Sequence, residues 1–165
     1  MLKLVTNQGG MTLAEILIAV VIIGVGLVAL SSAIPLAAYG IQEGNQLSTA
    51  TFLANERLEQ VRSARWESNP RPVDNLGVSS APTLAPVSGA VTTFPDEAAL
   101  PAPHGDYARA VRITDCGGGD GCSGITRDDL RQVTVSVSYR PMTGIGLAET
   151  GTAKAATITT FVAKR

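Results

Sequence analysis

An apolar run near the amino terminus constrains this chain more than any other feature. From Ile16 to Ala38 the sequence carries no charge, and only Ser31, Ser32 and Pro35 interrupt its apolar character. A run of about 18 or more such residues can cross a bilayer as a helix. Because lipid offers the backbone no hydrogen-bond partners, the run must be helical there despite its many β-branched residues. The sequence therefore predicts a membrane-spanning helix.

A single acid stands at the beginning of this run. Glu15 directly precedes Ile16, and an ionisable group costs about 2.5 to 3.5 kcal/mol near the centre of a bilayer and less near its edge. An acid in this position needs either a cationic partner or access to the lipid headgroups. Glu15 is therefore a candidate functional residue.

The residues around Glu15 resemble a known processing signal. Residues 10–15, GMTLAE, follow a polar leader and precede the apolar helix, and this arrangement is similar to the class III signal of type IV prepilins and type II secretion pseudopilins. The resemblance implies that a prepilin peptidase cuts between Gly10 and Met11 and methylates the new amine of Met11. It also implies that Glu15, the fifth mature residue, has the role of the family's glutamate.

Two positions depart from the usual signal. Met11 stands where the family usually has phenylalanine, and Ala14 replaces a larger aliphatic residue. Both replacements are apolar or small, so slower processing is the largest consequence that we expect.

The position of the leader separates this signal from an ordinary secretory one, which is cut after its apolar stretch and loses it. Removing residues 1–10 keeps the helix and creates a positive amine near Glu15, and an opposite charge within about 4 to 6 Å favours the ionised carboxylate. One helix does not easily pair its first residue with its fifth. We therefore hypothesise that Glu15 pairs with the Met11 amine of a neighbouring subunit and sets the axial register of an assembly. The alternative is an interfacial glutamate that reaches the headgroups.

Composition limits the remainder of the chain. Its 165 residues leave room, after the leader and the membrane helix, for one soluble domain of about a hundred residues. The net charge of −1 and the lack of a basic run argue against a nucleic-acid surface. Lys3 is the only charge of the leader and places the amino terminus on the cytoplasmic side by the positive-inside rule. We expect a single-pass inner-membrane protein whose soluble part faces the periplasm.

The two cysteines are predicted to form a disulfide. Cys116 and Cys122 flank a glycine-rich loop, CGGGDGC, and a close pair in an exported domain is typical of a disulfide. Free or redox-active thiols are the alternative. A zinc site needs about four ligands, and only His104 could join the cysteines, so we expect no metal and no cofactor.

Other candidate chemistry is sparse. Four aspartates near the cysteines could offer oxygen ligands to calcium, but their spacing does not match a calcium loop, and solvated turns are the preferred interpretation; they are Asp115, Asp120, Asp128 and Asp129. His104 lies in a Pro/Gly-containing loop without a nucleophile and acid at useful spacing. The glycine loop lacks the lysine of a phosphate-binding loop. We therefore expect no enzyme.

Periodicity predicts the soluble fold. The helix continues to about Trp66 with a 3.6-residue period, and its apolar stripe comprises Leu47, Ala50, Ala54, Leu58, Val61 and Ala64. Phe52 and Leu53 lie beside this stripe and are assigned to contacts with neighbouring helices. Two prolines end the helix, and the following Pro/Ser/Ala-rich stretch predicts a long irregular connection with one short strand at 87–94.

Three alternating segments predict an antiparallel sheet: 106–114, 130–140 and 152–164. One face of the sheet can cover the apolar stripe of the helix. The predicted fold class is α+β, with a long amino-terminal helix packed on a small antiparallel sheet. This is also the pilin architecture that the resemblance implies.

The predicted organisation has five parts. These are a leader (1–10), a transmembrane or filament-core helix (11–38), an amphipathic helical half (39–66), a variable connecting loop (67–105) and a sheet head with the disulfide loop (106–165).

The resemblance also implies a function. The segment FLANERLEQVRS, residues 52–63, is similar to minor pilins of the PilV type and to the I-type minor pseudopilin. The likeness to minor pilins implies a subunit for pilus assembly or initiation that is finally displayed at the cell surface. The implied partners are other pilin and minor pilin subunits, the prepilin peptidase, the inner-membrane assembly platform and the lipid bilayer. A minor pseudopilin of type II secretion, usually a shorter chain, is the nearest alternative. A single-pass membrane enzyme or receptor is a third possibility and predicts an unprocessed amino terminus.

Overall fold

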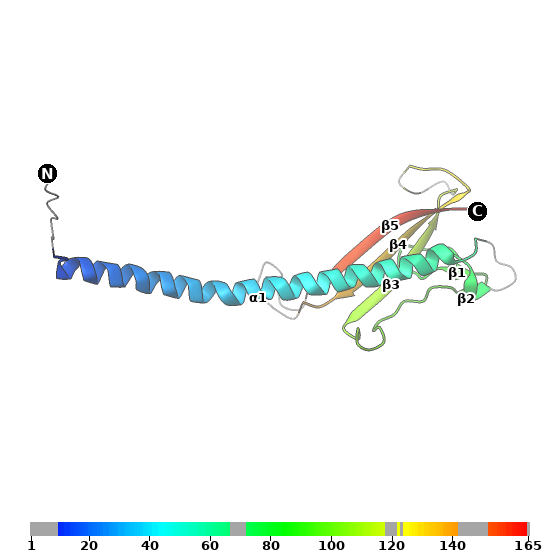
Figure 1. The fold of residues 1–165 in the computed structure, drawn as a ribbon. Helices are drawn as coiled ribbons and strands as arrows, with labels where there is room; N and C mark the ends of the chain where they lie inside the picture. The colour runs from blue at the N-terminus through cyan, green and yellow to red at the C-terminus, as the bar shows by residue number, and fades with distance from the viewer. Residues whose placement is uncertain (1–9, 67–71, 118–121, 123, 142–151, 165) are drawn as a thin grey trace, which may run out of the picture. The chain divides into compact units, whose positions relative to one another are not determined.

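The structure, a computed structural model, describes residues 10–66, 72–117, 122, 124–141 and 152–164. Its elements in chain order are helix α1 (Leu13–Ser63), a 3₁₀ turn η1 (Pro72–Asp74) and the strands β1 (Val87–Ser88), β2 (Val91–Thr92), β3 (Tyr107–Asp115), β4 (Leu130–Tyr139) and β5 (Lys154–Ala163) (Figure 1). The predicted α+β class, with one long helix and an antiparallel sheet, is confirmed.

The chain divides into two compact units, one ending at Ile41 and the other beginning at Gln42. We call residues 13–41 of α1 the apolar half and residues 42–63 the amphipathic half. The helix is continuous through Pro35 and Gly40. Among the described residues, α1 is the helix that is long and apolar enough to cross a membrane, and its most apolar 18-residue window has no buried residue.

The second unit is built on a three-stranded sheet with the order β3-β4-β5, antiparallel throughout. Val135 in β4 lies opposite Val111 in β3 and Ile158 in β5. Alternate residues of the strands point to one apolar face, whose fully buried members are Val111, Ile113, Val133, Val135 and Val137. The three predicted strands are therefore present, and no strand end is shifted by more than two residues.

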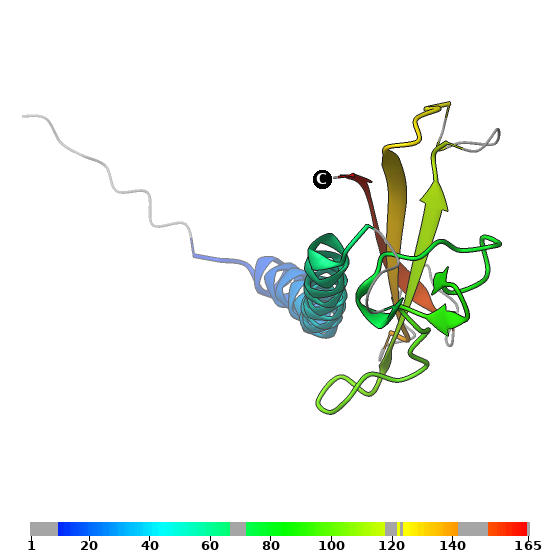
Figure 2. The same ribbon diagram turned by 90° about the vertical axis from the view of Figure 1, so that its right-hand side faces the viewer.

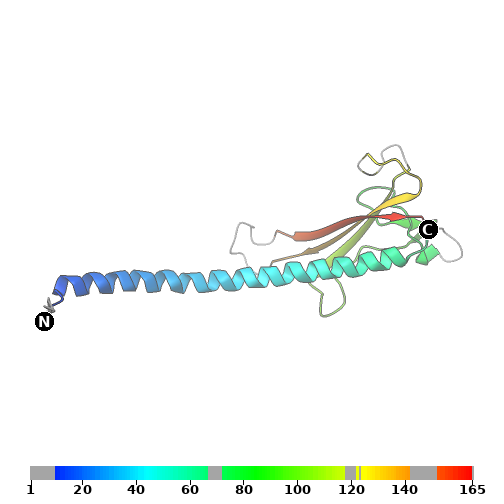
Figure 3. The same cartoon turned by 45° about the horizontal axis from the view of Figure 1, so that its top comes forward.

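The amphipathic half of α1 lies along this face of the sheet (Figures 2 and 3). Its buried residues recur at spacings of three and four, as a helix covered on one side requires; they are Ala50, Leu53, Ala54, Leu58 and Val61. At the start of β5, Lys154 forms an ion pair with Glu43 of the helix. The predicted stripe thus packs on the chain's own sheet.

Two side chains, one beside the predicted stripe and one within it, differ from expectation. Leu53, assigned to contacts with neighbouring helices, is only 4% exposed in the core of its own unit, because it lies three residues after Ala50 on the buried side. Leu47 was placed in the stripe but is 48% exposed, since burial of the helix begins one turn later at Ala50. Phe52 is 66% exposed.

The connecting segment is more ordered than a long irregular loop. In place of one strand over 87–94, β1 and β2 form a short hairpin, and Gly89 in its turn has a φ of +61°, which favours glycine. Single apolar side chains from the segment enter the core: Leu76, Pro86, Phe94 and Leu100. They are isolated in the sequence and have no period, so the pattern gave no sign of their burial.

Candidate functional site

The amino-terminal end of α1 begins with a threonine cap. The backbone N–H of Glu15 donates to the Thr12 carbonyl oxygen at 3.0 Å and lies 3.3 Å from Thr12 Oγ1. The N–H of Ile16 donates to the same carbonyl at 3.2 Å. Threonine is favoured at this position because its hydroxyl accepts one of the N–H groups that a helix start leaves unpaired. Thr12 and Glu15 also have the spacing of a capping box.

The predicted cleavage bond lies outside the helix. Gly10 and Met11 both precede the first helical residue, Leu13, and Met11 is 69% exposed. A Cβ atom placed on Gly10 would meet no atom within 4 Å. The backbone at this bond is therefore open to a large partner. Cleavage between Gly10 and Met11 and methylation of Met11 remain predictions.

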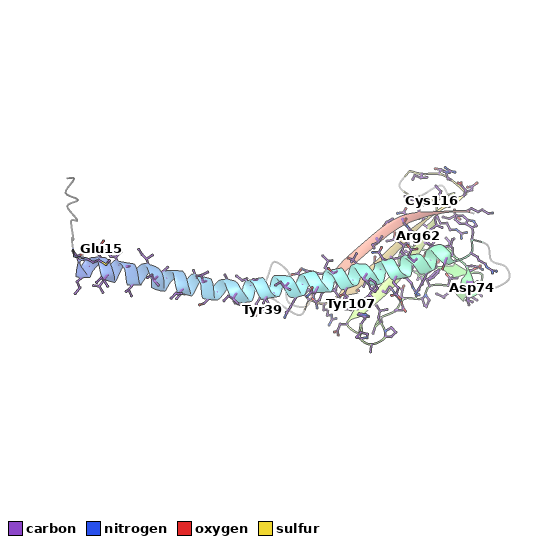
Figure 4. All side chains as sticks on the ribbon, in the orientation of Figure 1. Glu15, Tyr39, Arg62, Asp74, Tyr107 and Cys116 are labelled. Atoms are coloured by element: carbon purple, nitrogen blue, oxygen red, sulfur yellow. A yellow bond between two sulfur atoms is a disulfide. The ribbon has the colours of Figure 1, made fainter. Side chains whose placement is uncertain are left out.

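Glu15 lies in the first turn of α1, where Figure 4 labels it. The partial positive charge at a helix amino terminus stabilises a carboxylate by about 0.3 to 1 kcal/mol. The Glu15 carboxylate forms no ion pair and accepts no side-chain hydrogen bond from any other residue that the structure describes. The described part of the chain thus supplies a helix dipole to this acid but no cation.

The apolar side chains that follow Glu15 are uncovered by their own chain. From Ile16 onward, the large hydrophobic residues of the apolar half have exposed fractions from 50% at Ile16 to 73% at Val28. Soluble monomers rarely expose a continuous apolar surface of more than a few hundred Å². This surface is therefore suited to lipid or to neighbouring apolar helices.

The structure joins the two predicted disulfide cysteines. Cys116 and Cys122 are bonded through their sulfur atoms, and both side chains are buried. The N–H of Cys116 donates to the Leu130 carbonyl at 3.1 Å, and the N–H of Arg127 donates to the Cys116 carbonyl at 3.0 Å. The bridge therefore joins Cys116, which follows β3, to Cys122, which precedes β4. It belongs to the second unit, whereas Glu15 belongs to the first.

Two of the predicted aspartates near the bridge, Asp115 and Asp129, have hydrogen-bond partners within the protein. Arg127 donates to both carboxylate oxygens of Asp129, at 2.8 and 2.5 Å, and this hydrogen bonding lowers the pKa of the exposed Asp129. Asp115 accepts the N–H of Gly117 at 3.0 Å. Across the described residues no group of three or more metal-ligating side chains occurs; Asp120 lies outside them.

His104, the one histidine, packs edge-on against an aromatic ring. Its ring centroid lies 6.1 Å from that of Tyr107, with the planes at 76°. This is the ordinary geometry of an aromatic pair. It gives His104 a packing role in the loop before β3.

Sequence reasoning missed a buried charged cluster in the second unit. Arg109 in β3 is 8% exposed and donates to Glu97 at 2.7 Å. It also donates to the Leu53 carbonyl of α1 at 3.3 Å and pairs with Glu56 at 3.4 Å. Arg57 of the helix shares Glu97 at 3.3 Å, and burial lowers the pKa of its guanidinium. The cluster ties α1, the connecting segment and β3 together. Its only sequence signal was a charge at an inward position of an alternating strand.

A second arginine of β3 holds the connecting segment on the opposite face. Arg112 donates to both carboxylate oxygens of Asp96, at 2.5 and 2.8 Å. It also donates to the carbonyls of Pro82 and Thr83, at 3.2 and 2.9 Å. The hydrogen bond from Arg112 lowers the pKa of Asp96. The connecting segment is therefore fixed by charge on both sides of β3.

Comparison with known proteins identifies the amino-terminal motif. The prokaryotic N-terminal methylation motif matches residues 5–31, which include Glu15 and most of the apolar half of α1. No curated protein and no solved structure matches the chain. The motif indicates a prepilin substrate like those of type IV pilins and pseudopilins, and a structural subunit rather than an enzyme. Motif and apolar helix together are consistent with membrane anchoring.

Proposed function

We propose that the chain is a minor type IV pilin of the PilV kind, cut between Gly10 and Met11 and N-methylated at Met11. Its helix enters a filament and its sheet domain is displayed outside. The observation that carries the proposal is the Glu15 carboxylate, which has no cation within its own described chain and stands within a methylation motif at the head of an uncovered apolar helix.

Cleavage supplies the missing charge. A new ammonium group at Met11 lies just before a helix amino terminus, where the partial positive charge of the helix disfavours it by a few tenths to about 1 kcal/mol. The same ammonium placed against the Glu15 carboxylate of another subunit would gain an opposite charge in a medium of low dielectric constant. Pairing between subunits therefore gives the Met11 ammonium and the Glu15 carboxylate each an opposite charge. It also fixes the axial position of one subunit relative to the next in the filament.

The apolar half of α1 suits two successive environments. The precursor spans the inner membrane once, with its amino terminus cytoplasmic and its soluble part periplasmic, and lipid covers the apolar side chains. In the filament, neighbouring pilin and minor pilin helices replace the lipid. The implied partners are these subunits, the prepilin peptidase, the inner-membrane assembly platform and the bilayer. The net charge of −1 supports protein rather than nucleic-acid partners.

Mass spectrometry of the amino terminus tests this function. In the membrane fraction of cells with the peptidase we expect a chain that begins with N-methylated Met11. In cells without the peptidase we expect the precursor that begins at Met1. Recovery of the full precursor from peptidase-containing cells would overturn the proposal.

A second measurement separates the pilus from the secretion pseudopilus. We expect the protein in filaments sheared from the cell surface, in amounts far below those of the major subunit. Its restriction to a periplasmic secretion complex, with none in sheared pili, would replace the minor pilin by a minor pseudopilin.

A further inference from the structure

Thr12 marks the boundary between two backbone conformations. Helix α1 begins at the next residue, and Thr12 offers both its hydroxyl and its carbonyl oxygen to the N–H of Glu15. A residue in this capping position has extended rather than helical backbone angles. The predicted cleavage bond between Gly10 and Met11 lies immediately on the non-helical side of this boundary.

The boundary matters because a peptide bond inside a helix is a poor substrate for hydrolysis. If α1 began one turn earlier, the Gly10 carbonyl would accept the N–H of Ala14 as an ordinary helical hydrogen bond. Its carbon would then be enclosed by the helical backbone. A bond in extended backbone presents its carbonyl freely to a peptidase.

We propose that Thr12 is a positioning residue for processing, because its side-chain cap holds the bond between Gly10 and Met11 outside the helix. The inference rests on the proposed function, since it concerns a peptidase substrate. Near lipid, unpaired N–H groups are costly. Without the hydroxyl of Thr12, the chain satisfies them by adding helical residues upstream, and this draws the cleavage bond into the helix.

Three substitutions separate a cap from a recognition contact. Thr12→Val keeps the branched shape but removes the acceptor. Thr12→Ser keeps a hydroxyl, and Thr12→Asn supplies an acceptor of different shape that caps helices at least as well. If the peptidase reads the threonine hydroxyl itself, the asparagine variant fails. If the cap is what matters, the asparagine variant is processed.

The measurement is the initial rate of cleavage of the full-length precursor in vesicles that contain a prepilin peptidase. For Thr12→Val we expect KM to rise about tenfold with kcat unchanged, because only the fraction with an extended cleavage site binds. The serine and asparagine variants should stay within about twofold of the wild type. Equal KM values for the valine variant and the wild type overturn the proposal, and so does an asparagine variant as slow as the valine variant.

Amide hydrogen exchange at Ala14 provides a readout that is independent of the peptidase. In detergent micelles, Thr12→Val should exchange this amide about tenfold more slowly than the wild type, because the upstream helical turn offers its N–H the Gly10 carbonyl, whereas serine and asparagine should keep the wild-type rate. Unchanged exchange in the valine variant overturns the link between the cap and the start of the helix. A wild-type precursor that the peptidase leaves uncut overturns the proposed function instead, and the two failures are thereby distinguished.

Discussion

The two halves of α1 belong to one continuous helix but have different surroundings. In the apolar half, Leu27 is 59% exposed and no residue is buried by the chain. In the amphipathic half, a stripe that includes Leu53 and Leu58 lies against the sheet, and each is 4% exposed. The same residue type is thus covered by its own chain in one half and left for an external partner in the other.

This difference shows where the stability of each half originates. Burial of a leucine against the sheet contributes about 1.5 to 3 kcal/mol to folding of the second unit. An exposed leucine of the apolar half contributes to folding only once lipid or another subunit covers it. The amphipathic half therefore belongs to the folding of one chain, and the apolar half belongs to membrane insertion and assembly.

The largest expected effect on filament assembly is tested with an acid in each half. Glu15→Ala removes the only charge at the head of the apolar half, so we expect normal cleavage but at least a tenfold loss of the protein from purified filaments, the equivalent of about 1.4 kcal/mol or more of assembly free energy. Quantitative immunoblotting of sheared filaments against total membranes measures this loss.

Glu59→Ala is the matched control in the amphipathic half. Glu59 is exposed and pairs with Arg62 on the surface of the helix, where such pairs contribute about 1 kcal/mol or less. This variant should enter filaments at the wild-type level. If Glu15→Ala entered filaments at the wild-type level, the hypothesis that Glu15 sets the axial register of the subunits would be wrong.

A leucine in each half tests the origin of stability directly. Leu53→Ala leaves a cavity between α1 and the sheet and should destabilise the second unit by about 3 kcal/mol. Leu27→Ala makes the same chemical change in the apolar half and should leave unfolding of the sheet unchanged. Denaturant unfolding of the mature protein in detergent, followed by the fluorescence of Trp66, measures both.

Phe52 supplies a second control beside Leu53. Because its side chain is 66% exposed, Phe52→Ala should change the free energy of unfolding by less than about 0.5 kcal/mol. Equal destabilisation by the two substitutions would mean that the buried stripe of α1 is not the one described.

The features that the sequence predicted are those with a local period. Alternation predicted β3, β4 and β5, and the apolar run with the glutamate before it predicted the methylation motif that matches residues 5–31, because each pattern depends on neighbouring residues alone. Leu53 was assigned outward because it lies at the margin of the stripe. The width of the buried stripe depends on the surface that covers the helix, here the sheet. The helical period of the sequence carries no information about that surface.

The features that were missed depend on contacts between distant segments. Leu76 and Phe94 reach the core as single residues of a Pro-rich stretch, and their burial follows from the path of the backbone. Arg109 can face inward because its guanidinium donates hydrogen bonds to Glu97 and to the Leu53 carbonyl. Its inward position was visible in the alternation of β3, but its partners lie 12 and 56 residues away.

The smallest expected effect is a pH dependence that arises in the connecting segment of the second unit. The apolar half contains no titratable side chain from Ile16 to Ala38, whereas Asp96 is held by Arg112, whose hydrogen bond lowers the pKa of Asp96 from its usual 3.8. A lowered pKa in the folded state means that the ionised acid stabilises folding above pH 3.8. This contribution is lost as the pH falls through the folded-state pKa.

Because Asp96 is 48% exposed, water screens the pair, and Asp96→Asn should cost less than about 1 kcal/mol at neutral pH. The difference between wild type and variant should shrink below about pH 4 as the wild-type acid becomes protonated. Arg112→Gln should abolish the same pH dependence, since it removes the donor that lowers the pKa, although the loss of its bonds to Pro82 and Thr83 makes it the more destabilising variant. Urea unfolding of the mature protein between acidic and neutral pH measures all three chains. A difference between wild type and Asp96→Asn that grows toward low pH would show that Asp96 is not ionised in the folded connecting segment.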